Sequence, residues 1–316
     1  MTQPATTSTT RIPPSVKIRE VGARDGFQNE PELIPTDVKI ELIQKLAASG
    51  VPRMELTSFV RADVVPQLAD GPEVLRRVVL PDSVERSVIT PNERGLEAAL
   101  GMKQHFDDIN VFVSASESHN RRNVNRSVAE SLEGLNRMLP RIAEAGLRPR
   151  ASISTAFGCP YEGVVPLEKV VDIARSLIEA GAVDILLGDT TGMANPRQAR
   201  HYFEVLLSEF GDAAEFTAHF HNTRGAGLAN VLGALEAGCT SFDSSFGELG
   251  GCPFPPGATG NIATEDLVSM LDGMGVETGI DIDVVLDAAR SVRETLGRPL
   301  TSHTLVAGPV DWNPHR

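Results

Sequence analysis

The chain is poor in cysteine and in basic residues, and it lacks any long apolar run. Three cysteines in 316 residues are too few and too scattered for a disulfide framework. Lysine and arginine number 29 against 42 acidic residues, a net charge of −13, which argues against binding nucleic acid or anionic membranes. No apolar stretch approaches the roughly 18 residues of a membrane span. We therefore expect a soluble protein of the reducing cytoplasm.

The two ends of the chain also lack a folding pattern. Residues 1–15 are rich in threonine, serine and proline, with neither the apolar core of a secretion signal nor the arginines of an organelle-targeting peptide. Such a composition buries too little apolar surface to fold, so we expect a disordered leader. Residues 297–316 show no periodicity and are predicted to be a surface extension.

Between these ends, short β-branched runs alternate with amphipathic segments. Thr36 is a candidate N-cap of a helix that ends at Gly50, and Glu-Ala-Gly sequences predict three more helix ends. The predicted strands are 16–21, 53–57, 85–90, 109–113, 150–155, 183–187, 215–220 and 240–244. This alternation predicts one (β/α)8 TIM barrel over residues 16–296. A doubly wound open sheet is the alternative, but no GxGxxG follows the first strand.

Polar residues gather where several predicted strands end. In a barrel, the carboxyl ends of the strands carry the active site, whereas chance would scatter such residues over both ends. The residues concerned are Arg24, Asp25 and Gln28 after the first strand, Glu55 and Ser58 at the second, Asp189 after the sixth, His219 and His221 at the seventh, and Cys252 and Asn261 after the eighth.

Two of these residues predict a metal site. His219 and His221 are two positions apart on a strand, so their imidazoles face the same side. An isolated pair of this kind is more often a hydrogen-bonded core pair, but here Asp25 adds a carboxylate and Asn261 a carbonyl oxygen. A mixed set of nitrogen and oxygen ligands favours Mg²⁺ or Mn²⁺.

Arg24 and Cys252 add chemistry to that site. Arg24 is either one half of a surface ion pair with Asp25 or a fixed cation that stabilises an enolate-like oxyanion. Cys252 lies among glycines and prolines that suit a mobile loop, and a thiol with an ordinary pKa of about 8.5 is a candidate general acid. Glu55 and Asp189 either orient the ligands and Arg24 or bond to neighbouring loops.

Four segments carry a family resemblance. They are residues 24–30 (RDGFQNE), 55–60 (ELTSFV), 158–163 (GCPYEG) and 250–267, which begins GGCP and ends TEDL. With these segments the chain resembles the 3-hydroxy-3-methylglutaryl-CoA (HMG-CoA) lyases, members of the DRE-TIM metallolyases.

The resemblance implies cleavage of HMG-CoA into acetyl-CoA and acetoacetate. It implies that Asp25, His219, His221 and Asn261 hold the metal, with Asp25 also a candidate base. Arg24 would stabilise the enolate and Cys252 would be the catalytic thiol on a mobile loop. The implied polar supports are Glu55, Asp189 and Glu265.

Some positions depart from the family pattern and leave the acyl group open. Phe27, Asn222 and Phe254 stand where leucine, aspartate and tyrosine are usual, and residues 116–120 are less apolar than usual. We expect Phe27, Gln28 and Ser58 to contact the substrate, with Phe27 reshaping the acyl pocket. A lyase for a related 3-hydroxyacyl-CoA is therefore an alternative.

Two further readings are less favoured. A Claisen-type synthase would carry additional C-terminal domains and lack the GGCP loop, and a non-catalytic barrel would not need the ligand set. Arg121 and Arg122, after the fourth strand, are candidate contacts to the anionic CoA, with a solvated helix face as the alternative. We also expect a homo-oligomer, a dimer.

Overall fold

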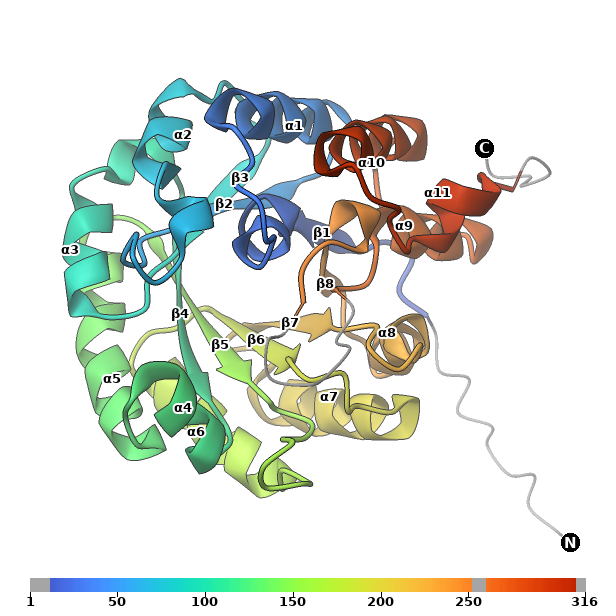
Figure 1. Ribbon diagram of the computed structural model, residues 1–316. Coiled ribbons are helices and arrows are strands. Elements are labelled where there is room, and N and C mark those ends of the chain that lie inside the picture. Colours follow the sequence, from blue (N-terminus) through green and yellow to red (C-terminus); the bar gives the residue numbers. More distant parts are fainter. Residues whose placement is uncertain (1–11, 252–259, 311–316) are drawn as a thin grey trace, which may run out of the picture.

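The computed structural model describes residues 12–251 and 260–310, and it contains a closed parallel barrel of eight strands (Figure 1). Strands that are neighbours in sequence pair in order, and β1 pairs with β8 to close the ring. The strands are β1 (Lys17–Glu20), β2 (Arg53–Ser58), β3 (Glu85–Ile89), β4 (Asp108–Ser114), β5 (Arg148–Ser154), β6 (Asp184–Asp189), β7 (Glu215–Phe220) and β8 (Ser241–Ser244). The predicted barrel is confirmed.

Helices surround this barrel (Figure 1). They are α1 (Thr36–Ala48), α2 (Gly71–Arg77), α3 (Glu93–Leu100), α4 (Glu117–Val124), α5 (Val128–Glu144), α6 (Leu167–Glu179), α7 (Pro196–Phe210), α8 (Gly227–Glu236), α9 (Thr264–Gly273), α10 (Ile282–Leu296) and α11 (His303–Ala307). The predicted helix ends hold, because Gly50, Gly146, Gly181 and Gly238 all adopt positive φ. Thr36 is not an N-cap, since it is the first helical residue and its hydroxyl bonds to Asp70 instead.

The C-terminal segment, predicted to be a surface extension, contains a short helix and packs against the barrel. Leu300 and Leu305 are buried, and α11 contacts α9. The carboxylate of Asp266 accepts hydrogen bonds from the Ser302 hydroxyl and from the backbone N–H groups of the next two residues. This part of the chain is therefore packed onto the barrel. Among the described residues, no helix is long and apolar enough to cross a membrane.

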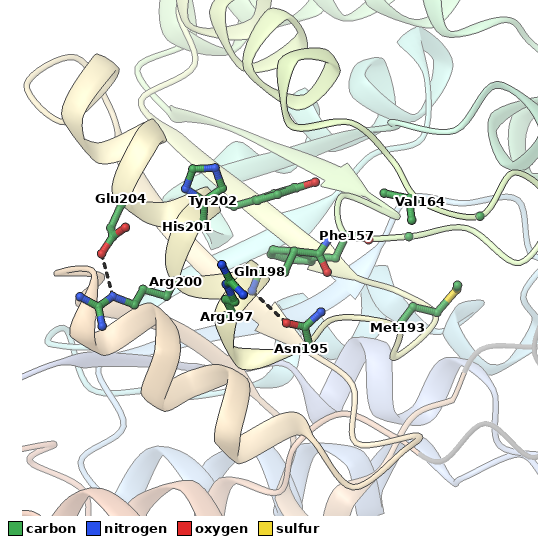
Figure 2. Close-up of a pocket in the computed structure, with 12 residues that line it drawn as sticks. Phe157, Val164, Met193, Asn195, Arg197, Gln198, Arg200, His201, Tyr202 and Glu204 are labelled. Atoms are coloured by element: carbon green, nitrogen blue, oxygen red, sulfur yellow. Dashed lines mark hydrogen bonds and ion pairs between the residues drawn. The ribbon is translucent and has the colours of Figure 1, made fainter.

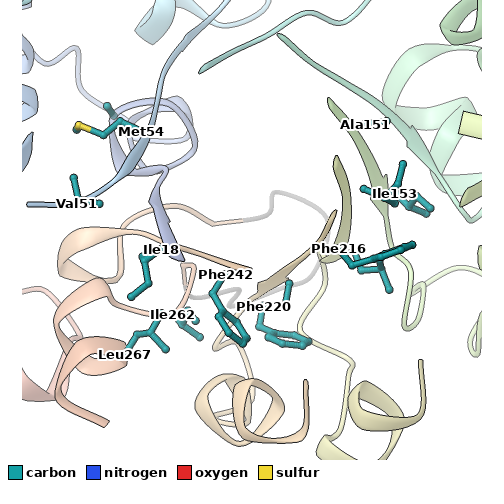
Figure 3. Packing of buried hydrophobic residues seen from close by; sticks show 14 of the residues in the cluster. Ile18, Val51, Met54, Ala151, Ile153, Phe216, Phe220, Phe242, Ile262 and Leu267 are labelled. Carbon is teal, nitrogen blue, oxygen red and sulfur yellow. The ribbon is translucent and has the colours of Figure 1, made fainter. Parts of the chain in front are cut away.

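Apolar side chains fill the space between the strands and the helices (Figure 3). Ile18, Met54 and Phe242 are fully buried in this layer. Because successive side chains on a strand point to opposite faces, the alternate residues of the same strands lie inside the barrel.

The inside of the barrel is ionic. Arg19 of β1 pairs with Asp108 of β4 at 3.2 Å, and Arg150 of β5 pairs with Asp184 of β6 at 2.6 Å. These four side chains are at most 1% exposed. A buried charge is costly unless it is paired, so the strands that contribute these residues must close in register.

Candidate metal centre and active site

A tight turn after β1 brings Arg24 and Asp25 to the mouth of the barrel. Gly22–Gly26 forms a single π-helical turn, a feature that is often found at functional sites. A Cβ atom on Gly22 would lie 2.5 Å from the Phe246 ring, so glycine lets the turn pack tightly against the loop that follows β8.

The two histidines meet Asp25 at the carboxyl end of β7. The Nε2 atoms of His219 and His221 lie 3.2 Å apart, and His219 Nε2 lies 4.0 Å from Asp25 Oδ2. One ligand atom from each of the three residues falls within 4.8 Å of the others. The structure thus brings three of the four predicted metal ligands close enough together to share one cation.

Asn261, the fourth predicted ligand, lies beside them. Its Nδ2 donates to Asp25 Oδ2 at 2.8 Å and to the Leu249 carbonyl at 3.1 Å. Its Oδ1 is buried and accepts no hydrogen bond from any described residue. A buried polar atom normally has a partner, so this oxygen is available to a ligand, although Nδ2 is the amide atom that faces Asp25 in this structure.

Charge in this cluster also suits a cation. Burial opposes the ionisation of Asp25, but Arg24 and the imidazoles outweigh it and hold the pKa of the carboxyl well below its usual range. Burial, aided by His219, lowers the pKa of His221 to about 4. At neutral pH the cluster therefore offers a carboxylate and at least one neutral imidazole, the forms that bind metal.

Asp243 is a functional residue that the sequence reading missed. It is the β8 neighbour of His219, and its Oδ2 lies 3.3 Å from His219 Nδ1. A carboxylate there favours a proton on Nδ1, and in the neutral imidazole this is the tautomer whose Nε2, on the side of Asp25 and His221, can bind a metal. The available signal was an acidic residue on the predicted strand next to the one that bears the histidines.

Arg24 is buried, which excludes the surface ion pair considered above. Its guanidinium donates to the carboxylates of both Asp25 and Glu55, and only 9% of the residue is exposed. Asn110 donates to the second oxygen of Glu55 at 3.2 Å. Glu55 therefore holds Arg24 in position, which is the first of the two roles considered for it from the sequence.

Asp189 and Glu265 support loops through backbone bonds. Asp189 accepts from the N–H groups of Met193 and Ala194 at 2.8 and 3.0 Å, and burial raises its pKa to about 7. Glu265 accepts from Gly247 N at 3.0 Å, and burial raises its pKa to about 8. Asp189 therefore shapes the loop after β6. Glu265 shapes the loop after β8 and also bonds to the Ser302 side chain of the C-terminal segment, and neither carboxylate holds Arg24.

A cavity of about 430 Å³ opens above the ligand cluster. Of the three residues predicted to contact the substrate, Gln28 and Ser58 line this cavity and Phe27 does not. Phe27 is fully buried and its ring packs edge-on against Phe246, with ring centroids 6.0 Å apart. The prediction that Phe27 contacts the substrate is therefore not supported, because its side chain points into the core.

Other residues of the cavity wall were not anticipated. One side is apolar, and α4 contributes a buried imidazole, His119. The unanticipated lining residues include Val60, Val64, Val65, Ile89, Phe112, His119 and Asn123. Gly251 also lines the cavity, and its carbonyl accepts from the Asn29 amide. Cys252, the next residue, lies outside the described residues.

Arg121 and Arg122 are on α4 and do not line this cavity. Arg121 pairs with Glu117 at 2.9 Å, and the Arg122 guanidinium lies 4.3 Å above the ring of Tyr161. A larger cavity of about 900 Å³ lies between α7 and residues 157–164 (Figure 2). It contains none of the predicted site residues.

The fold and the site define a class: TIM-barrel enzymes with a carboxylate, two imidazoles and a buried arginine at the barrel mouth. Within that class, the family described as HMGL-like matches residues 15–292, and the chain belongs to this family. The resemblance noted in the sequence is confirmed, and the chain is a carbon–carbon lyase of the hydroxymethylglutaryl-CoA lyase type.

Similar proteins agree with this assignment. A hydroxymethylglutaryl-CoA lyase from Bacillus subtilis is 45% identical over 93% of this chain and 97% of its own. An (R)-citramalyl-CoA lyase from Chloroflexus aurantiacus is 41% identical over 94% of this chain and 96% of its own. A solved HMG-CoA lyase from Acinetobacter baumannii, in complex with coenzyme A and 3-methylmalate, is 37% identical over 96% of this chain and 98% of its own, with a TM-score of 0.89.

Proposed function

We propose that the protein cleaves HMG-CoA to acetyl-CoA and acetoacetate and that it uses Mg²⁺ or Mn²⁺. The observation that carries this proposal is the convergence of Asp25, His219 and His221 within 4.8 Å beside a buried arginine. The 45% identical relative, which is named for this activity, supports the choice of substrate.

The residues that would hold the cation are Asp25, His219, His221 and Asn261 through its Oδ1 atom. A divalent cation bound there would act as a Lewis acid that lowers the pKa of the substrate hydroxyl. Because the pKa of Asp25 lies well below its usual range, this carboxylate is better suited to be a ligand than the base that takes the hydroxyl proton.

Arg24 would stabilise the product of the bond cleavage. Removal of the hydroxyl proton breaks the C–C bond, releases acetoacetate and leaves the electron pair on the enolate of acetyl-CoA. Arg24 lines the cavity and is fixed by two carboxylates. A cation that is already oriented costs no reorganisation when the oxyanion forms.

Cys252 would return a proton to the enolate. The support for this role is its sequence context: it follows Gly251, which lines the cavity, in the glycine- and proline-rich loop that the family resemblance covers. A thiol can give up a proton near neutral pH. One proton is removed from the substrate hydroxyl and one proton is delivered to the enolate carbon, so the overall reaction balances.

A related 3-hydroxyacyl-CoA is the second candidate substrate. The observation that favours it is His119, a buried imidazole in the cavity wall and part of the unusual segment 116–120. One relative at 41% identity is named for (R)-citramalyl-CoA cleavage, so the family also accepts a different acyl group.

A single assay separates these candidates. The protein is stripped with a chelator, restored with Mg²⁺ or Mn²⁺, and given HMG-CoA or (R)-citramalyl-CoA while acetyl-CoA is measured. Metal-dependent release from HMG-CoA supports the proposal, and release from citramalyl-CoA alone moves the substrate to the second candidate. No release from either, or release that survives chelation, contradicts the proposed chemistry.

The proposed contact between CoA and the two arginines of α4 can be tested separately. Replacing both Arg121 and Arg122 by alanine should raise KM for the CoA ester, because the two cations attract its phosphates. Arg137 and Arg141, exposed on α5 and paired with glutamates, provide a matched double-alanine control. An unchanged KM in the first variant would remove these arginines from the site.

A further inference from the structure

We infer that Arg150, in the centre of the barrel, is a positioning residue that orients two parts of the site at once: Arg24 through Glu55, and His219 through Asp243. The inference rests on the proposed function only in taking this cluster as a metal centre. It assigns a role to a residue that neither lines the cavity nor belongs to the ligand set.

Arg150 occupies the middle of the barrel interior. It comes from β5, and its side chain is 1% exposed. Its Nε donates to Asp184 Oδ2 at 2.6 Å, which anchors the guanidinium on the neighbouring strand. From this anchor, NH1 points toward acidic groups contributed by other strands, at 3.9 Å from Glu55 Oε2 and 3.7 Å from Asp108 Oδ1.

The first arm runs from Arg150 to Arg24. Glu55 receives the guanidinium of Arg24 from above, while Arg150 attracts its other oxygen from below. Asn110 donates to that same oxygen and is itself held by the Ser152 hydroxyl, which donates to Asn110 Oδ1 at 2.9 Å. Glu55 therefore lies between two arginines, of which Arg24 is hydrogen-bonded to it and Arg150 is 3.9 Å away, and its rotamer sets the position of Arg24.

The second arm runs from Arg150 to His219. Asp243 uses Oδ2 for His219 Nδ1, and its Oδ1 is buried with no hydrogen bond to any described residue. The NH1 and NH2 groups of Arg150 are likewise buried without a hydrogen-bond acceptor in the described ranges. The positive charge of Arg150 acts on Asp243 and on Asp108, whose Oδ1 is also buried without a hydrogen bond from the described residues. The unpaired donors and the two unpaired acceptors therefore belong to one charged interior.

Buried donors and acceptors of this kind are normally joined by internal water. We therefore expect at least one ordered water between the Arg150 guanidinium and Asp243 Oδ1. Such a bridge turns Oδ1 toward Arg150 and leaves Oδ2 for His219. A lysine could not replace this arrangement, because only the planar guanidinium presents several donors in fixed directions.

The test combines a charge-balanced variant with metal binding. R150Q together with D184N removes one positive and one negative charge, so the interior keeps its net charge. We expect Mn²⁺ affinity, followed by the EPR signal of free Mn²⁺, to fall by about 10- to 100-fold, as for other groups that orient metal ligands. We also expect kcat for the CoA ester to fall more than KM rises.

A single variant serves as the control. R148Q removes an arginine of the same strand that pairs with Glu85 at 2.6 Å at the open end of the ion network. It should keep the metal affinity of the unaltered protein. A merely structural role for Arg150 would lower the midpoint of unfolding and leave the metal affinity of the folded protein unchanged, which would overturn the inference.

A second test uses the unaltered protein and so does not require that any variant folds. A high-resolution crystal structure should contain a water within about 3 Å of both an Arg150 nitrogen and Asp243 Oδ1, and a dry contact of both groups with other side chains would overturn the inference. If the unaltered protein binds no Mn²⁺, the proposed function fails. If it binds Mn²⁺ and R150Q/D184N binds it equally well, only the present inference fails.

Discussion

Replacing Asp243 by asparagine or alanine should weaken metal binding although Asp243 is not one of the predicted metal ligands. Its Oδ2 lies 3.3 Å from His219 Nδ1 and holds the imidazole with its Nε2 toward His221 and Asp25. Asparagine keeps the size and an acceptor oxygen but loses the charge. Alanine loses both, so the two variants separate the contribution of the charge from that of the hydrogen bond.

The expected loss of metal affinity follows from the strength of the hydrogen bond between Asp243 and His219. A hydrogen bond to a charged group contributes about 1.5–3 kcal/mol and a neutral one about 1 kcal/mol. At about 1.4 kcal/mol per factor of ten, Asp243→Ala should weaken the affinity by roughly 10- to 100-fold. Asp243→Asn keeps the neutral part of the bond and should lose roughly 2- to 30-fold. The expected order is unaltered protein, then asparagine, then alanine.

The assay is titration of chelator-stripped protein with Mn²⁺, with circular dichroism to show that each variant is folded. Asp266→Asn is the matched control, because Asp266 is a buried carboxylate that bonds only to the C-terminal segment in the described structure. It should lower stability and leave the affinity unchanged. Folded Asp243 variants that bind Mn²⁺ as tightly as the unaltered protein would refute the orienting role.

Other substitutions test other parts of the structure. His221→Ala and Cys252→Ser should both lose turnover, but only the first should weaken Mn²⁺ binding, and equal binding losses would contradict the separate roles. Phe27→Leu should lower the free energy of unfolding by about 1–2 kcal/mol without changing KM for the CoA ester, because the ring lies in the core; an altered KM would place it in the site after all. Burial lowers the pKa of His119 to about 4, whereas the unfolded value is about 6.5, so protonation favours the unfolded chain and stability falls as the pH drops from about 6.5 to 4. His119→Phe should remove up to about 3 kcal/mol of that loss. Denaturant unfolding at pH 7 and 4.5 measures it, and a variant that loses as much free energy of unfolding between these pH values as the unaltered protein would contradict this reasoning.

Strand positions were predictable where the local pattern is strong. β7 spans Glu215–Phe220, as predicted, because its alternating apolar residues pack against the helices. β4 begins at Asp108, one residue before the prediction, since an aspartate by itself indicates a loop. It is buried as part of the strand because Arg19 and Arg150 neutralise it from other strands.

The candidate site was predictable to the extent that its residues lie at strand ends. His219 and His221 were found from their spacing, and Asp25 from its place after the first strand. Asp243 and Arg150 were not found, because each is an ordinary strand residue until the closed barrel juxtaposes it with another charge. The positions of residues 297–310 were also unpredictable, since the bonds to Asp266 that fix them depend on tertiary packing.

The first and last strands are neighbours in the ring, and this determines when the ligand cluster can form during synthesis of the chain. Asp25 bonds to Asn261 across 236 residues of sequence, so the cluster cannot form until the chain has been synthesised past Asn261. A cation can be captured only when translation has passed β8 and the ends of the barrel have met. Uptake of the proposed metal would therefore be a late event in biogenesis, and once bound the ion would stabilise the finished ring by ligation to the folded state alone.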